Sequence, residues 1–393
     1  MKKNISLFTF IGLILGIIFG LFFSDYVKYI EFIGTFYIQF LKYMIVPVVF
    51  TSICVSVYDS RKLKGNLVLK TIGLFAIMFV ATFLLTSLIV LIIDPSNGFV
   101  LEDVEWDGTT TDFNILDMFI NLIPKDLNKF LTGSNLLFVI IISFVVAYIS
   151  SYVNSGDKFI DIIRKIKGFL FKVLEYFMYI TPFAVFSLMS VTVSKYGYMI
   201  LGVGVKYILT AYLCALFTLT LIMALPILII CKMSPIEFIK KVNKIWLMTI
   251  TTCSSSATLP YTIKTCNEEF NVPESVTNVV VPLGCTIHMC GGAVSFALLG
   301  IFCSKLFNVD ITVSKYILMM ISAVLINMSA PGIPNGGVVI GATYLQLLGI
   351  PLDFIGFYSG IYKLLDMIYT SLNVTGDITA NVIINYTDNK NID

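Results

Sequence analysis

The sequence predicts an all-α polytopic membrane protein, and three observations support that fold class. Apolar residues make up 58% of the 393 positions and charged residues only 13%, which is about half the charged share of a soluble domain. Several apolar stretches reach the length of about 20 residues that a membrane-spanning helix needs. Two of those stretches are interrupted by Ser/Thr, Gly and Pro near their middles. This composition excludes a soluble enzyme, a disordered chain and, at a net charge of +2, a nucleic-acid-binding protein.

Stretches with few or no charged residues follow one another along the chain. They are 5–23, 32–58, 71–93, 130–156, 176–194, 207–231, 245–263, 275–304, 316–352 and 364–376. The first is long enough to span a bilayer and shows no clear cleavage site, so we interpret it as a membrane helix rather than a signal peptide. The interruptions in 245–263 and 316–352 favour re-entrant hairpins, whose broken backbone is tolerated where protein or a cavity shields it.

The charged loops predict how the chain is oriented. Basic clusters occupy 61–70, 158–172 and 232–244, and an acidic segment occupies 94–129. Because basic loops stay in the cytoplasm, we expect both termini inside and the acidic segment outside, in the plasma membrane. Hairpin 245–263 then enters from the cytoplasm and hairpin 316–352 from outside, an arrangement typical of transporters.

The last apolar stretch carries polar side chains that are costly inside a bilayer. Ionisable groups at such positions indicate function. A pair between Lys363 and Asp366 at a cytoplasmic helix end is the simpler interpretation, but it leaves the later polar residues unexplained. At helical spacing, one face of the helix collects Asp366, Tyr369, Thr370, Asn373 and Asp377.

The first hairpin and the stretch after it add two further candidates. Ser254–Ser256 comes one residue before a Thr-Leu-Pro sequence, where we expect the helix to break and leave free N–H groups for a carboxylate. The only histidine, His288, lies just before Gly291 and Gly292, which favour unwinding, and an imidazole can carry a proton near neutral pH. Because no G-x-S-x-G sequence accompanies the serines, a hydrolase is not expected.

Together these motifs resemble the glutamate-transporter-type family of dicarboxylate/amino acid:cation symporters, over nearly the whole chain. Segments 41–50 and 84–87 are similar to the family's second and third helices, Ser254–Pro260 to the tip of its first hairpin, and Gly332–Pro334 to that of its second. Asp366-Met367 and Thr370–Asp377 resemble the signature of its eighth helix.

The resemblance implies eight transmembrane helices plus two oppositely oriented re-entrant hairpins, assembled as a homotrimer in the lipid bilayer. It also implies an elevator-type movement of a transport part against a scaffold part. The scaffold would comprise 1–70 and 94–195, the transport part 71–93 and 196–386, and a cytoplasmic tail 387–393.

Carried over residue by residue, the resemblance also implies a substrate site. Asp366 would bind the α-ammonium group of an amino acid, and Asn373 with the backbone around Ser255 would bind its α-carboxylate. The complete expected set is Ser254, Ser255, Ser256, Thr258, Met289, Gly292, Ile333, Gly337, Asp366, Tyr369, Thr370 and Asn373.

No cofactor is expected beyond a coupling ion. The resemblance implies one Na⁺ held by Asp377, Asn373 and the carbonyl of Gly284. A second would be held by Thr286 and by backbone carbonyls near Asn327, Met328 and Ala330. The remaining cation-site candidates are Thr86, Ser87 and His288.

Two departures from the family pattern bear on substrate and ion. Acidic-substrate members carry an arginine where this chain has Tyr369, and the chain's only arginines, Arg61 and Arg164, lie in the basic loops. An unpaired side-chain carboxylate would be costly in the membrane, so a neutral amino acid is predicted. The alternatives are an acidic amino acid or C4-dicarboxylate symporter that uses Lys363, and a channel or substrate sensor that does not transport.

The second departure concerns the family's Asn-Met-Asp-Gly-Thr sequence, which here reads His288-Met289-Cys290-Gly291-Gly292. The thiol of Cys290 replaces a carboxylate and is a poor ligand for a hard cation. Either fewer Na⁺ ions are coupled to transport, or His288 carries a proton instead.

Overall fold

The computed structural model describes residues 5–62, 66–97, 136–153, 155–197, 199–327 and 336–389, and every regular element within these ranges is a helix. The predicted all-α class is therefore confirmed. The first half contains α1 (Ile5–Phe22), η2 (Ser24–Tyr29), α2 (Glu31–Lys62), α3 (Asn66–Ile93), α6 (Leu136–Ser150), α7 (Gly156–Phe177), η3 (Met178–Ile180) and α8 (Thr181–Tyr196). The second half contains α9 (Met199–Phe217), η4 (Thr218–Ala224), α10 (Leu225–Cys231), α11 (Pro235–Thr252), α12 (Ser255–Glu269), α13 (Glu274–Ile287), α14 (Cys290–Leu306), α15 (Val313–Asn327), α16 (Gly336–Leu347) and α17 (Asp353–Asn389).

Three helical segments among the described residues are long and apolar enough to cross a bilayer: Leu67–Ile93, Leu201–Cys231 and Glu274–Leu306. Shorter apolar helices include Leu7–Phe22, Val313–Asn327 and Gly336–Leu347. The expected number of eight spans stays a prediction, and most of the acidic segment 94–129 lies outside the described residues.

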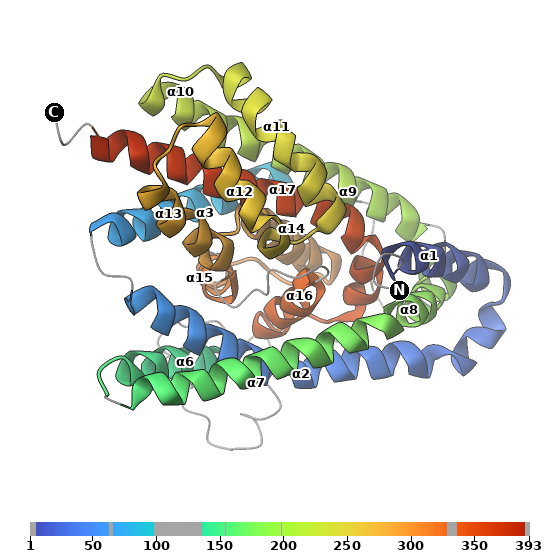
Figure 1. Cartoon of the computed structure of the whole chain (residues 1–393). Helices are drawn as coiled ribbons and strands as arrows, with labels where there is room; N and C mark the ends of the chain where they lie inside the picture. Colours follow the sequence, from blue (N-terminus) through green and yellow to red (C-terminus); the bar gives the residue numbers. More distant parts are fainter. Residues whose placement is uncertain are drawn as a thin grey trace.

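The helices α14 and α17 form the centre of the molecule, and the others surround them (Figure 1). Residues of α14 are buried almost without exception, including the large Phe296 and Phe302. The helix α3 packs on α14, and an ion pair at each of its ends ties it to the central helices. Lys70 pairs with Asp388 of α17, and Asp94 pairs with Lys305 of α14 at 2.8 Å.

A second group of helices lies along one side of Figure 1, where α2 packs on α6, α7 and α8. The basic segment 158–172, expected as a loop, instead lies within the 22-residue helix α7. Its exposed apolar residues Phe159, Ile162, Ile166 and Phe169 recur every three or four positions, which is the helical period. The dense Lys and Arg residues obscured this amphipathic pattern in the sequence.

Glycines let α1 approach α8 closely. Gly12, Gly16 and Gly20 recur every four residues, and a Cβ at Gly16 would lie 2.6 Å from the carbonyl oxygen of Phe186. At Gly20 the corresponding distance to Ser190 is also 2.6 Å. Small residues at this spacing are a common way for membrane helices to pack backbone against backbone.

We expect Gly16→Ala to destabilise the protein by about 1–3 kcal/mol, because the added methyl group forces α1 away from α8. The matched control is Gly73→Ala in α3, where a Cβ meets nothing within 4 Å and alanine is the better helix former. Thermal unfolding in detergent would compare the two variants. Equal melting temperatures would show that the close approach of α1 and α8 does not limit stability.

Candidate functional site

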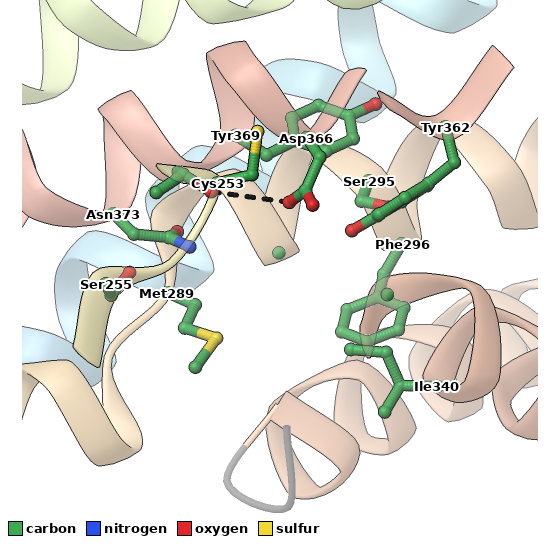
Figure 2. Close-up of a pocket in the computed structure, with 13 residues that line it drawn as sticks. Cys253, Ser255, Met289, Ser295, Phe296, Ile340, Tyr362, Asp366, Tyr369 and Asn373 are labelled. Carbon is green, nitrogen blue, oxygen red and sulfur yellow. Dashed lines mark hydrogen bonds between the residues drawn. The ribbon is translucent and has the colours of Figure 1, made fainter. Parts of the chain in front are cut away.

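One cavity lies where the first hairpin, the broken helix α13–α14, α16 and α17 converge (Figure 2). In Figure 2 the rings of Tyr362 and Phe296 lie on one side of the Asp366 carboxylate, with Asn373 and Met289 on the other. Its lining residues are Cys253, Ser255, Met289, Gly292, Ser295, Phe296, Gly337, Ile340, Tyr362, Asp366, Tyr369, Thr370 and Asn373.

The first hairpin turns at Cys253 and Ser254. Cys253 ends α11 in the left-handed conformation with φ of 47°, and Ser254 is extended. The hydroxyl of Ser254 accepts a hydrogen bond from the N–H of Ala257 and so caps α12. The break expected at Thr258–Pro260 is therefore misplaced, since Pro260 lies inside α12. The cap makes Ser255 the first residue of the new helix, and Ser255 lines the cavity.

Eight of the twelve expected substrate residues line this cavity: Ser255, Met289, Gly292, Gly337, Asp366, Tyr369, Thr370 and Asn373. Ser254 acts as the helix cap, and the hydroxyl of Thr258 donates back to the carbonyls of Ser254 and Ser255. Ser256 is exposed and lies 3.8 Å from the thiol of Cys285. Ile333 lies outside the described residues.

Five lining residues were not among the expected ones: Cys253, Ser295, Phe296, Ile340 and Tyr362. Tyr362 precedes Asp366 by one helical turn, so the helical spacing in the sequence could have predicted that both lie on the same face of α17. Ser295 and Phe296 follow the broken segment 288–289 by about two turns of α14, and no pattern in the apolar sequence marks them.

Asp366 supplies the carboxylate among the described residues that line the cavity. Asp366 is 7% exposed, and its Oδ1 accepts a hydrogen bond of 3.3 Å from Thr370. Tyr369 is also buried, and its hydroxyl oxygen has no hydrogen-bond partner in the part of the chain that is described. The cavity therefore offers an anionic group that a substrate cation can pair with.

Two further contacts place polar groups at the cavity. The Oδ1 atom of Asn373 accepts a hydrogen bond from the N–H of Gly291 at 2.8 Å, which leaves the amide NH₂ of Asn373 as a donor. The ammonium group of Lys363 lies 3.0 Å from the thiol sulfur of Cys253. Lys363 thus places a positive charge beside a residue that lines the cavity, although Lys363 itself does not line it.

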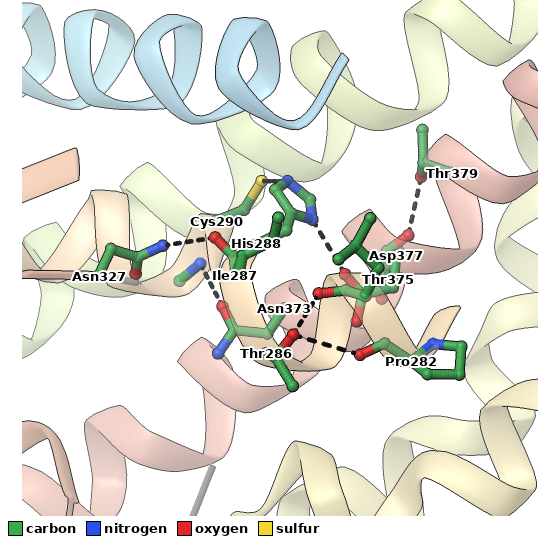
Figure 3. A network of polar contacts seen from close by, with 12 residues as sticks. Pro282, Thr286, Ile287, His288, Cys290, Asn327, Asn373, Thr375, Asp377 and Thr379 are labelled. Atoms are coloured by element: carbon green, nitrogen blue, oxygen red, sulfur yellow. Dashed lines mark hydrogen bonds and ion pairs between the residues drawn. The ribbon is translucent and has the colours of Figure 1, made fainter. Parts of the chain in front are cut away.

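A second polar cluster lies where α13 and α14 are separated, next to α17 (Figure 3). His288 is extended and Met289 is also non-helical, and the side chain of His288 lies between two polar partners. Its Nδ1 lies 2.9 Å from Oδ1 of Asp377, and its Nε2 lies 3.1 Å from Sγ of Cys290. The ring stacks on Phe75 at a centroid distance of 4.3 Å, so all of these groups are shielded from solvent.

The other expected cation ligands are placed as follows. Gly284 packs directly against the carboxylate of Asp377. The hydroxyl of the exposed Thr286 donates to the carbonyl of Leu283 at 2.8 Å, while Asn327 is buried and its Oδ1 has no partner among the described residues. In α3, Ser87 donates to Phe83. Met328 and Ala330 lie outside the described residues.

Two of these expected cation ligands have a buried side-chain oxygen without a hydrogen bond among the described residues. Like the Oδ1 of Asn327, the hydroxyl of Thr86 is buried without a hydrogen bond among the residues that the structure describes. Across those residues, no group of three His, Cys, Asp or Glu side chains could hold a metal ion. Hydroxyl, amide and backbone oxygens are hard ligands of the kind that suits an alkali cation.

A model of the sodium:dicarboxylate symporter family matches residues 5–387 of the chain. The match covers every helix described above except the last two residues of α17. The resemblance inferred from the sequence motifs is thereby confirmed.

Similar proteins cover nearly the same length. The chain is 28% identical to a proton/sodium-glutamate symport protein of Geobacillus stearothermophilus, over 97% of this chain and 94% of that protein. It is 26% identical to a proton/glutamate-aspartate symporter of Bacillus subtilis, over 98% and 95%. Identity to a C4-dicarboxylate transport protein of Bacillus subtilis is 21%, over 99% and 94%.

Proposed function

Because the chain belongs to the sodium:dicarboxylate symporter family, we propose that it is a secondary active symporter that carries a neutral amino acid across the plasma membrane, driven by Na⁺. The family is one of membrane transporters rather than enzymes. The main support is the cavity around the buried Asp366, where none of the lining residues that the structure describes is an arginine.

The lining suggests how an amino acid would be held. Asp366 pairs with the α-ammonium group, and Thr370, already bonded to that carboxylate, keeps it oriented. The NH₂ group of Asn373 and the backbone at Ser255, in the first turn of α12, receive the α-carboxylate, since a helix N-terminus attracts anions. Tyr369 remains beside the substrate side chain.

The positions of the two arginines in the chain favour a neutral substrate over an acidic one. Arg164 lies on α7, where it pairs with Asp59 at 2.8 Å and with Asp161 at 2.5 Å. Arg61 belongs to the last turn of α2. A guanidinium fork is the group that best matches a second carboxylate, and Arg164 is not among the described residues that line the cavity.

For the coupling ion, we propose that Na⁺ binds near Thr286 and Asn327. The support is the buried Oδ1 of Asn327, an oxygen without a partner among the described residues. We further propose that α2 with α1 and α6–α8 forms the scaffold of a homotrimer, and that α3 with α9–α17 moves as the transport part. The packing of α3 on α14, and of α17 on α11–α14, supports this division.

A thermal-shift screen of the purified chain tests the function. Ligands that bind the folded state raise its melting temperature by mass action. Neutral amino acids are expected to stabilise the protein when NaCl is present and less when choline chloride replaces it. Stabilisation by glutamate, aspartate or C4-dicarboxylates alone would refute the proposed substrate. Binding without accumulation in proteoliposomes would favour a sensor or channel.

An acidic substrate is the second candidate, and the position of Lys363 favours it. An ammonium group 3.0 Å from Cys253 could pair with a second carboxylate that extends toward the first hairpin. This is also the substrate class named for the relatives described above.

We expect Lys363→Met to separate the two candidates. For a neutral substrate, the loss of a charge beside the cavity changes affinity by less than about tenfold, because no interaction with the substrate is removed. For an acidic substrate, the loss of the pairing charge weakens binding by roughly 30-fold or more. Isothermal titration with serine and with glutamate provides the measurement. The exposed Lys264→Met on α12 is the matched control.

A further inference from the structure

We propose that the protein itself fills the position in which the family resemblance expects a Na⁺ at Asp377. The imidazole of His288 takes the place of that cation and holds α17 against the segment in which α13 and α14 separate. We call this contact between His288 and Asp377 the clasp. This inference rests on the proposed symport function, because it reduces the number of Na⁺ ions that the cycle carries.

The two ring nitrogens of His288 contact Asp377 on one side and Cys290 on the other. A neutral imidazole with its hydrogen on Nδ1 donates to Oδ1 of Asp377 at 2.9 Å and accepts the S–H of Cys290 at Nε2, at 3.1 Å. One tautomer therefore gives a partner to Oδ1 of Asp377, to both ring nitrogens and to the thiol. The exposed fraction is 1% for His288 and 2% for Asp377.

The surrounding backbone is shaped to hold the ring. A Cβ at Gly376 would lie 2.8 Å from Cε1 of His288, and a Cβ at Gly284 would collide with the Asp377 carboxylate. Phe75 covers the ring face with its plane tilted by only 7°. The imidazole is therefore packed between Phe75 and Gly376, and it contacts the carboxylate that the cation would need.

The remaining ligands of the expected site are also engaged. Oδ1 of Asn373 accepts the N–H of Gly291 at 2.8 Å, and the carbonyl of Gly284 accepts the N–H of His288 at 2.9 Å. Cys290 contributes a thiol instead of a hard oxygen. By contrast, Oδ1 of Asn327 is buried and unpaired within the described ranges, so the second expected site keeps an oxygen available for Na⁺.

His288 is the chain's only histidine, which makes the clasp directly observable. Nitrogen NMR of the full chain, labelled in histidine and purified without a histidine tag, would be recorded in NaCl and in choline chloride. The inference predicts a protonated Nδ1, an unprotonated Nε2 and the same signals in both salts. Loss of the Nδ1–H signal when Na⁺ is added would overturn it, because Na⁺ would then displace the imidazole.

The thermal response of the substrate-free protein to NaCl gives a second readout. Asp377→Asn is expected to leave the Na⁺-dependent rise in melting temperature unchanged, whereas Asn327→Ala is expected to abolish it. In the double variant His288→Asn/Cys290→Asp, which restores the family's oxygen ligands, the slope against the logarithm of Na⁺ concentration should roughly double, because a second ion adds its own mass-action term.

The opposite pattern would contradict the clasp: Asp377→Asn loses the Na⁺ response, or the double variant keeps the original slope. If the unmodified protein shows no Na⁺ response at all, the proposed Na⁺ coupling fails. The NMR comparison then still decides whether His288 holds Asp377.

Discussion

Asp366→Asn is expected to weaken binding of a neutral amino acid by about 30-fold to several thousand-fold. Removing one partner of a buried, hydrogen-bonded charge pair costs about 2–5 kcal/mol, and every 1.4 kcal/mol is about tenfold in affinity. Asp366 is 7% exposed and lines the cavity, so bulk water screens its charge only weakly. Isothermal titration in NaCl measures the change.

The control for this variant is Asp353→Asn, which removes an exposed carboxylate at the start of the same helix α17. We expect it to leave amino acid affinity unchanged. Unaltered binding in Asp366→Asn, with the melting temperature preserved, would show that the α-ammonium group is held elsewhere.

Tyr369→Arg is expected to shift the preference from neutral to acidic amino acids. The position faces the cavity from α17 and is 3% exposed. An arginine there offers two parallel N–H donors to a side-chain carboxylate. Hydrogen bonds to charged groups contribute about 1.5–3 kcal/mol each, so glutamate affinity should rise by at least about tenfold. Neutral amino acids should lose affinity, since they leave the buried guanidinium unpaired.

Tyr369→Phe is the matched control for the arginine variant. The hydroxyl of Tyr369 makes no hydrogen bond in the described structure, so its removal is expected to change neutral amino acid affinity by less than about tenfold. Competition binding with serine and glutamate compares all three proteins. A wild-type protein that already prefers glutamate, with no gain in Tyr369→Arg, would contradict the role given to this position.

The all-α class and much of the cavity could be predicted from the sequence, because both depend on local periodicity. Asp366, Tyr369, Thr370 and Asn373 share a face through helical spacing alone, and all four line the cavity. Among the expected residues of the first hairpin, Ser255 does so as well. Their chemical type stands out against an apolar background, where each polar group is costly.

The turn of the first hairpin was misplaced because proline is a weak boundary signal on its own. Pro260 is accommodated within α12, whereas the actual break depends on the left-handed conformation of Cys253, which its residue type does not favour. The helix α7 was expected as a loop for a related reason, since its charges hide an apolar face that only appears at helical spacing.

Contacts between segments that are far apart in the chain could not be predicted from the sequence. His288 and Asp377 are 89 positions apart and meet only because α13 breaks beside α17. Lys363 and Cys253 are separated by 110 positions. Pairing of this kind follows from how whole helices pack, which periodicity within one segment does not specify.

Uptake into proteoliposomes tests whether the protein carries a neutral amino acid with Na⁺. The purified protein is reconstituted, an inward Na⁺ gradient is imposed, and accumulation of radiolabelled serine is measured beside that of glutamate. We expect serine to accumulate above its external concentration, a sodium ionophore to abolish this accumulation, and glutamate not to accumulate. Accumulation of glutamate without serine, or serine uptake that is indifferent to the Na⁺ gradient, would contradict this expectation.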